Sequence, residues 1–139
     1  MLNIFSPLIL NQQKYPLFSS KISAGFPSPA DDYIEEALDL NQLLIKHPVA
    51  TFFVRAAGNA LDHIGIHDQD ILIIDRSLSP RNGQMIIAAV EGQLAIKRFQ
   101  KINNKIYLHS ENSATTIEMQ EENEIYLWGV ITTIIHNTL

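Results

Sequence analysis

Lys97 is the residue of this 139-residue chain best placed to act as a base. Strand alternation over residues 94–99 puts it between Ala95 and Phe99 on one face. Burial among apolar neighbours disfavours the charged form of a lysine and lowers its pKa, so that it can serve as a general base near neutral pH. A lysine that extends its stem to reach water is the commoner outcome for one strand taken alone.

Residues 56–61 form a second segment of interest, Ala-Ala-Gly-Asn-Ala-Leu. Gly58 permits a sharp turn that would hold residue 60 at a strand end. The backbone N–H groups of Asn59 and Ala60 in such a turn can form an oxyanion hole. Ala60 itself has no atom that can attack a carbonyl. The segment therefore resembles the nucleophile turn of a protease from which the nucleophile is missing.

The step Ala24-Gly25 supplies a candidate substrate within the same chain. Small residues on both sides of a peptide bond let catalytic groups approach it, and Pro27 and Pro29 keep the following residues from forming a helix. An ordinary loop has the same composition. Together with Lys97 and the turn at Ala60, however, the step predicts a self-cleaving protease that has lost its nucleophile.

Two other sets of side chains could do chemistry. The first set could ligate a divalent ion and consists of Asp62, His63, His67, Asp68 and Asp70. A solvated polar loop is the simpler interpretation of these residues. The second set offers hydroxyls as substitute nucleophiles and consists of Ser77, Ser79, Ser110 and Ser113. We reject these serines because none lies in a turn like that at Gly58. The first set leaves open a small metal-dependent β domain with an ion near His63 and His67.

Composition indicates a soluble globular domain, with 46% hydrophobic and 18% charged residues. A net charge of −5 argues against a surface that neutralises phosphates, so we expect protein partners and no direct nucleic-acid binding. The chain has no cysteine, which fits the cytoplasm. The first ten residues lack a basic start and are too short to span a membrane, so we expect neither export nor membrane anchoring.

The pattern of prolines and apolar residues predicts two regions. Four of the six prolines lie within the first 29 residues, which favours an extended N-terminal arm over residues 1–30. Residues 31–139 form the second region, where Asp39 can cap a short helix that ends before His47-Pro48. Seven β segments then follow: 51–55, 71–75, 84–90, 94–100, 105–109, 115–119 and 125–136. Two-residue turns at Glu91-Gly92 and Asn103-Asn104 favour antiparallel hairpins, and the whole predicts an all-β body.

Several strings of residues resemble the LexA/UmuD family of Ser-Lys self-cleaving proteins, over nearly the whole length. They are YPLFS at 15–19, AGFPSPA at 24–30, DLNQLLI at 39–45, HP at 47–48, GI at 65–66, IAAV at 87–90, Lys97 and GV at 129–130. The resemblance implies an antiparallel β body like the LexA/UmuD C-terminal domain, with an extended arm and a short helix. It also implies a homodimer without cofactor or metal, which cleaves itself at Ala24-Gly25 with Lys97 as the general base.

The same resemblance implies a role in SOS mutagenesis. Cleavage would be stimulated by the RecA filament on single-stranded DNA, and the trimmed dimer would join a UmuC-like polymerase for translesion synthesis. Replicative polymerase subunits are further candidate partners. No helix-turn-helix segment precedes the arm in this sequence, which disfavours a repressor role.

Two departures from the family pattern are informative. The family has serine where Ala60 stands and usually glycine where Gln69 stands. Without the serine, the chain should be catalytically inactive. Ala60 is then either an engineered replacement that preserves the uncut form, which the intact Lys97 and Ala24-Gly25 favour, or the mark of a natural pseudo-protease that regulates a polymerase by binding only.

Overall fold

The computed structural model describes residues 13–18, 21–22 and 34–139. The chain divides into two compact units, Met1–Lys46 and His47–Leu139. The predicted boundary after residue 30 and the cleavage step Ala24-Gly25 both lie outside the described residues.

The first unit contains a two-stranded antiparallel sheet that the sequence analysis missed. Strand β1 (Tyr15–Phe18) pairs with β2 (Ile34–Leu38). Pro16 is tolerated in β1 because a two-stranded sheet has only edge strands. The predicted short helix is confirmed as α1 (Leu40–Leu44), and the side chain of Asp39 caps it by accepting a hydrogen bond from the Asn41 N–H at 2.9 Å.

The second unit is built on a seven-stranded antiparallel sheet, which confirms the predicted all-β fold. Its strands are β3 (Thr51–Arg55), β4 (Ile71–Asp75), β5 (Met85–Val90), β6 (Gln93–Ile102), β7 (Lys105–His109), β8 (Thr116–Glu118) and β9 (Ile125–Ile135). Their order in the sheet is β3-β4-β9-β5-β6-β7-β8. Short 3₁₀ helices occupy Pro48–Ala50, Asp62–Ile64 and Glu121–Asn123.

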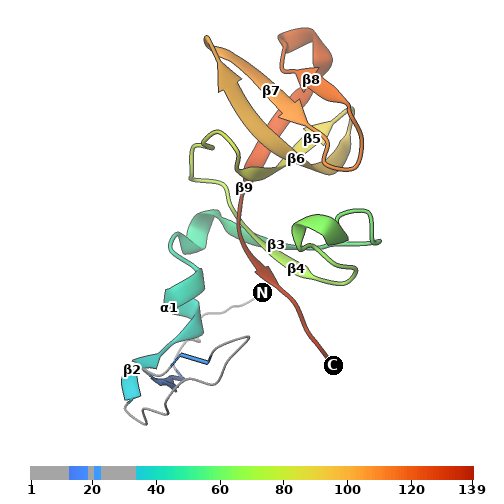
Figure 1. The fold of residues 1–139 in the computed structure, drawn as a ribbon. Helices are drawn as coiled ribbons and strands as arrows, with labels where there is room; N and C mark the ends of the chain where they lie inside the picture. Colours follow the sequence, from blue (N-terminus) through green and yellow to red (C-terminus); the bar gives the residue numbers. More distant parts are fainter. Residues whose placement is uncertain (1–12, 19–20, 23–33) are drawn as a thin grey trace, which may run out of the picture. The chain divides into compact units, whose positions relative to one another are not determined.

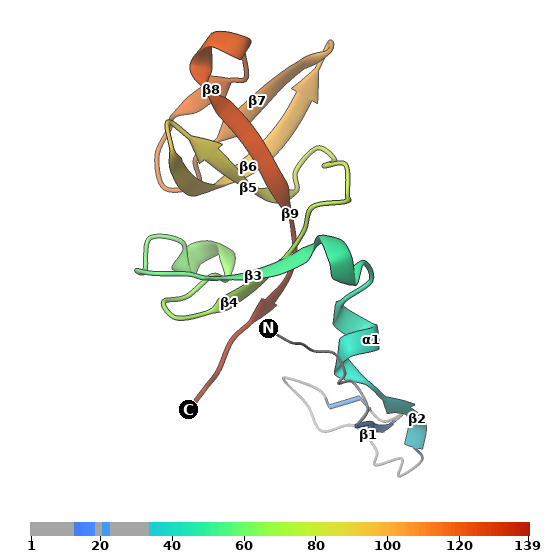
Figure 2. The same cartoon turned by 180° about the vertical axis from the view of Figure 1, so that it is seen from behind.

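Strand β9 joins the two parts of this sheet (Figures 1 and 2). Its first half pairs with β5, from Ile125 opposite Val90 to Val130 opposite Ile86. Its second half pairs with β4, as far as Ile135 opposite Ile71. The register shifts once along each of these pairings. A long strand with irregular register can therefore pair with two different strands along its length.

The two predicted hairpin turns are confirmed. All four turn residues have positive φ angles, 51° and 81° at Glu91-Gly92 and 49° and 66° at Asn103-Asn104. This is the backbone conformation of a two-residue hairpin turn. The second turn fixes the register of β6 against β7, from Ile102 opposite Lys105 to Arg98 opposite His109.

Strand alternation divides the interior of the second unit into two apolar clusters. Along β5, Ile86 and Ala88 face one cluster and Ile87 faces the other. One cluster comprises Ala56, Ile66, Leu72, Ile74, Ile87 and Ile131. The other comprises Ile86, Ala88, Phe99, Leu108, Ile125 and Val130. Among the described residues, no helix is long and apolar enough to cross a membrane.

Candidate functional site

The loop that carries Ala60 is attached to the sheet by backbone hydrogen bonds just beyond β3. The Ala56 N–H donates to Asp70 O at 2.8 Å, and the Gln69 N–H donates to Ala56 O at 2.9 Å. Gly58 has a φ of 87°, a left-handed conformation that glycine adopts at little cost. Its N–H donates to Asp68 Oδ1 at 2.6 Å. The loop at 67–70 thus fixes the turn at Gly58.

Ala60 lies at an exposed position in the next turn of this loop. The turn is closed by the Asp62 N–H, which donates to Asn59 O at 3.3 Å. Within the part of the chain that the structure describes, the backbone N–H groups of Asn59 and Ala60 donate to no backbone carbonyl. Two such donors are what an oxyanion hole needs.

Lys97 reaches the site from β6, where it pairs with Ile86 of β5. Its side chain is half-buried, and Nζ donates a hydrogen bond to Ser110 Oγ at 2.6 Å. Ser110 comes directly after β7, in a turn closed by its own N–H donating to Thr115 O at 3.0 Å. The ion pair between Arg98 and Glu111 also ties this turn to β6.

Ala60 and Lys97 line one cavity of about 400 Å³. That volume lies within the range of small-molecule pockets. The lining is mostly small or apolar: Val54, Arg55, Ala56, Ala57, Gly58, Ala60, Leu61, Ile66, Leu72, Ile87, Leu94, Ala95, Ile96, Lys97 and Asn112. Folding therefore brings two of the predicted site residues together, whereas Asn59 is not among the described residues that line the cavity.

Sequence reasoning missed Ser110 and Asn112 as residues of this site. The rejection of Ser110 considered only turn geometry and overlooked strand register. The turn at Asn103-Asn104 places Arg98 opposite His109, and one further step along the hairpin places Lys97 opposite Ser110. The spacing of the two residues about the turn was thus a usable signal.

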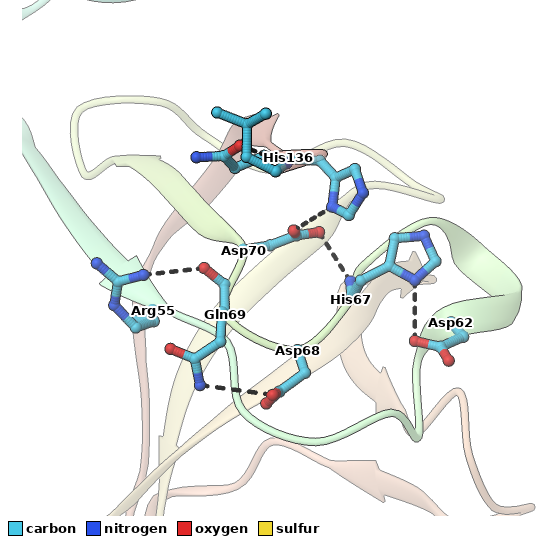
Figure 3. A network of polar contacts seen from close by, with 9 residues as sticks. Arg55, Asp62, His67, Asp68, Gln69, Asp70 and His136 are labelled. Carbon is cyan, nitrogen blue, oxygen red and sulfur yellow. Dashed lines mark hydrogen bonds and ion pairs between the residues drawn. The ribbon is translucent and has the colours of Figure 1, made fainter.

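A polar network surrounds the loop that supports Gly58 (Figure 3). Asp70 is buried, with Oδ1 2.6 Å from His136 Nδ1 and Oδ2 accepting from the His67 N–H at 2.8 Å. The backbone hydrogen bond from His67, aided by His136, lowers the pKa of Asp70 although burial opposes the shift. Arg55 donates to Gln69 O at 3.0 Å, and Gln69 has a φ of 72°.

His67 and His136 each pair with a carboxylate of this region. His67 Nδ1 lies 3.0 Å from Asp62 Oδ1, and the rings of His67 and His136 are 4.9 Å apart between centroids. Among the described residues, no group of three or more His, Cys, Asp or Glu side chains could hold a metal ion. The alternative of a metal-dependent domain thus gains no support from this loop.

Comparison with known proteins agrees with this architecture. A family model described as peptidase S24-like matches residues 16–132. Protein SamA of Salmonella typhimurium is 42% identical over 127 residues, which cover 91% of this chain and 89% of that protein. Protein MucA of Escherichia coli is 33% identical over 118 residues, covering 84% of this chain and 81% of that protein. A LexA repressor of Shewanella piezotolerans is 33% identical over 119 residues, covering 84% of this chain and 57% of the repressor. The chain therefore belongs to the peptidase S24-like family, which is the LexA/UmuD family whose sequence pattern it shares.

Proposed function

We propose that this chain is a UmuD-like accessory subunit of a translesion DNA polymerase in the SOS response, and that it does not cleave itself because Ala60 replaces the nucleophile. The observation that carries the proposal is the shared cavity. Ala60 comes from the loop after β3 and Lys97 from β6, yet both line the same space of about 400 Å³. Family membership over residues 16–132 supports it further.

The proposed reaction of the serine-containing parent follows from the roles of these groups. A serine hydroxyl at position 60 would attack the carbonyl carbon of Ala24, and its proton would pass to Lys97 Nζ. The N–H groups of Asn59 and Ala60 would stabilise the resulting oxyanion, and Lys97 Nζ would return the proton to the amine of Gly25 as it leaves. Water would then hydrolyse the ester between the residue 60 oxygen and Ala24, which releases residues 1–24 and restores the hydroxyl. Loss of the nucleophile of a serine protease costs about a millionfold in turnover, so the chain as it stands should remain uncut.

Self-cleavage after restoring the hydroxyl tests this proposal. The Ala60→Ser variant is incubated with RecA, single-stranded DNA and nucleotide, and its mass is followed by mass spectrometry. We expect fragments 1–24 and 25–139 from this variant and none from the unaltered chain. The matched control, Ala60→Ser combined with Lys97→Met, should stay intact because it lacks the base. An Ala60→Ser chain that stays full length contradicts the proposed cleavage chemistry.

The partners that we propose are a second copy of this chain, a UmuC-like polymerase, the RecA filament and replicative polymerase subunits. The net charge of −5 is consistent with protein partners, and the absence of cysteine with the cytoplasm. Co-purification of the chain with a tagged UmuC-like polymerase measures the central interaction. Failure of the two to bind would remove the accessory-subunit role.

The alternative is a natural pseudo-protease that regulates a UmuC-like polymerase by binding alone. Ala60 retains its backbone N–H and a small side chain, so the cavity can still accept a peptide. This alternative predicts polymerase binding together with no cleavage of the Ala60→Ser variant. Cleavage of that variant would favour a recent or deliberate replacement of serine.

A further inference from the structure

We propose that Ser110 and Lys97 form a nucleophile–base pair that captures an activated acyl or phosphoryl electrophile entering the cavity. Lys97 Nζ and Ser110 Oγ are 2.6 Å apart, within the reach at which an amine can take the proton of a hydroxyl. The charged amine donates to Oγ in this contact. Once the amine is uncharged, the hydroxyl donates to it instead, and the oxygen becomes the better nucleophile.

The backbone around Ser110 is held in place by two interactions. Ser110 follows the last residue of β7, and its N–H donates to Thr115 O at 3.0 Å. Next to it, Glu111 pairs with Arg98 of β6, and both side chains are less than a third exposed, at 22% and 30%. A partly buried Ser110 that is fixed in this way loses little conformational freedom on reaction.

The pair adjoins the cavity through two of its lining residues. Lys97 lines the cavity and contacts Ser110, and Asn112, two residues farther along the turn, lines it as well. Apart from Arg55, the remaining walls are small or apolar, including Ala56, Ala60 and Ala95. The site would therefore take an electrophile that carries a small apolar group. We expect a single covalent capture at Ser110 and not turnover of peptide bonds.

Diisopropyl fluorophosphate is a suitable probe of this pair. Ser110 Oγ would form a bond to phosphorus, the phosphorus–fluorine bond would break, fluoride would leave, and the hydroxyl proton would pass to Lys97 Nζ. The full chain is incubated with the reagent, and the adduct is located by peptide mapping. We expect one adduct, on Ser110.

Three variants separate this inference from general reactivity. Ser110→Ala should abolish the adduct, and Lys97→Met should slow labelling about a hundredfold, the usual contribution of a general base. Ser113→Ala is the matched control, because Ser113 lies in the same turn and accepts a hydrogen bond from the Thr115 N–H at 3.3 Å. It should label like the unaltered chain. Lys97→Gln serves as a second base variant if Lys97→Met fails to fold.

The inference is overturned if the unaltered chain carries no adduct on Ser110, if the label goes to Lys97 or another residue, or if folded Lys97→Met labels at the unaltered rate. It does not depend on cleavage at Ala24-Gly25. Labelling is measured in the chain with Ala60, whereas the proposed function is tested with Ala60→Ser. One can therefore fail while the other succeeds.

Discussion

Replacing Gly129 with alanine should destabilise the second unit, because β9 passes very close to β4 at this residue. A Cβ atom added to Gly129 would lie 2.6 Å from Ile74 Cγ2 and 3.0 Å from Asp75 O. Real Cβ atoms essentially never approach within 3.0 Å of another atom. Ile74 is fully buried, so its methyl group has no empty space to enter, and Asp75 O belongs to the backbone of β4.

The size of the effect follows from these contacts. Overpacking of a well-packed core costs about 1–3 kcal/mol, and alanine regains about 0.5–1 kcal/mol because glycine loses more backbone freedom on folding. We place the overpacking cost at the upper end of its range, about 3 kcal/mol, since one of the two close contacts is to backbone. The net loss in the free energy of unfolding is then about 2 kcal/mol. For a chain of this size the expected fall in Tm is about 6–10 °C.

Urea and thermal unfolding followed by circular dichroism measure this loss. A double-mutant cycle identifies its cause. Ile74→Ala removes Cγ2, so Gly129→Ala should cost about 1 kcal/mol less in the Ile74→Ala background than in the unaltered chain. A Gly129→Ala chain as stable as its parent would refute the reasoning. A cost that Ile74→Ala leaves unchanged would show that the Ile74 methyl is not the obstacle.

Two further predictions concern the loop that supports Gly58. Gln69→Gly should raise the free energy of unfolding by about 0.5 kcal/mol in urea titrations, because Gln69 has a φ of 72° and a side chain is costly in that conformation. Gln69→Ala keeps the penalty and should give no such gain, so equal stability of the two variants would contradict the explanation. Asp70 has a pKa below its ordinary value of 3.8, chiefly through the backbone hydrogen bond from His67. Its stabilising contribution is therefore present above that value and is lost as the pH falls through the lower folded-state pKa. Asp70→Asn should flatten the dependence of the urea midpoint on pH below about pH 4, whereas the exposed control Glu121→Gln should not. A curve for Asp70→Asn that keeps the parent's slope would be evidence against the role of Asp70.

Much of the local structure was predictable from the sequence. Apolar alternation located all seven strands of the second unit, and Asp39 located the start of α1. Asn103-Asn104 identified the turn between β6 and β7. Counting outward from this turn, one position beyond the pair of Arg98 and His109, brings Lys97 opposite Ser110. These features depend on residues close together in the chain, where side-chain alternation and turn chemistry act directly.

Other features depend on contacts that no local pattern specifies. The first-unit hairpin joins β1 to β2 across more than a dozen intervening residues, and neither strand has a strong apolar alternation of its own. Gln69 has a φ of 72° at a position where the family usually has glycine, and Arg55 donates a hydrogen bond to its carbonyl. The Asp70 carboxylate contacts the ring of His136, which lies 66 residues later in the chain.

The sequence by itself determined that this is a β protein with a lysine in a strand and an alanine where its family has the nucleophile. Only the tertiary structure decided that Ala60 and Lys97 line one cavity, and that the lysine bonds to Ser110. The physical reason is that alternation and turn residues fix which segments become strands, whereas the order of those strands depends on burying both apolar faces at once. That order, with β9 between β4 and β5, brings the loop after β3 to the same cavity as β6.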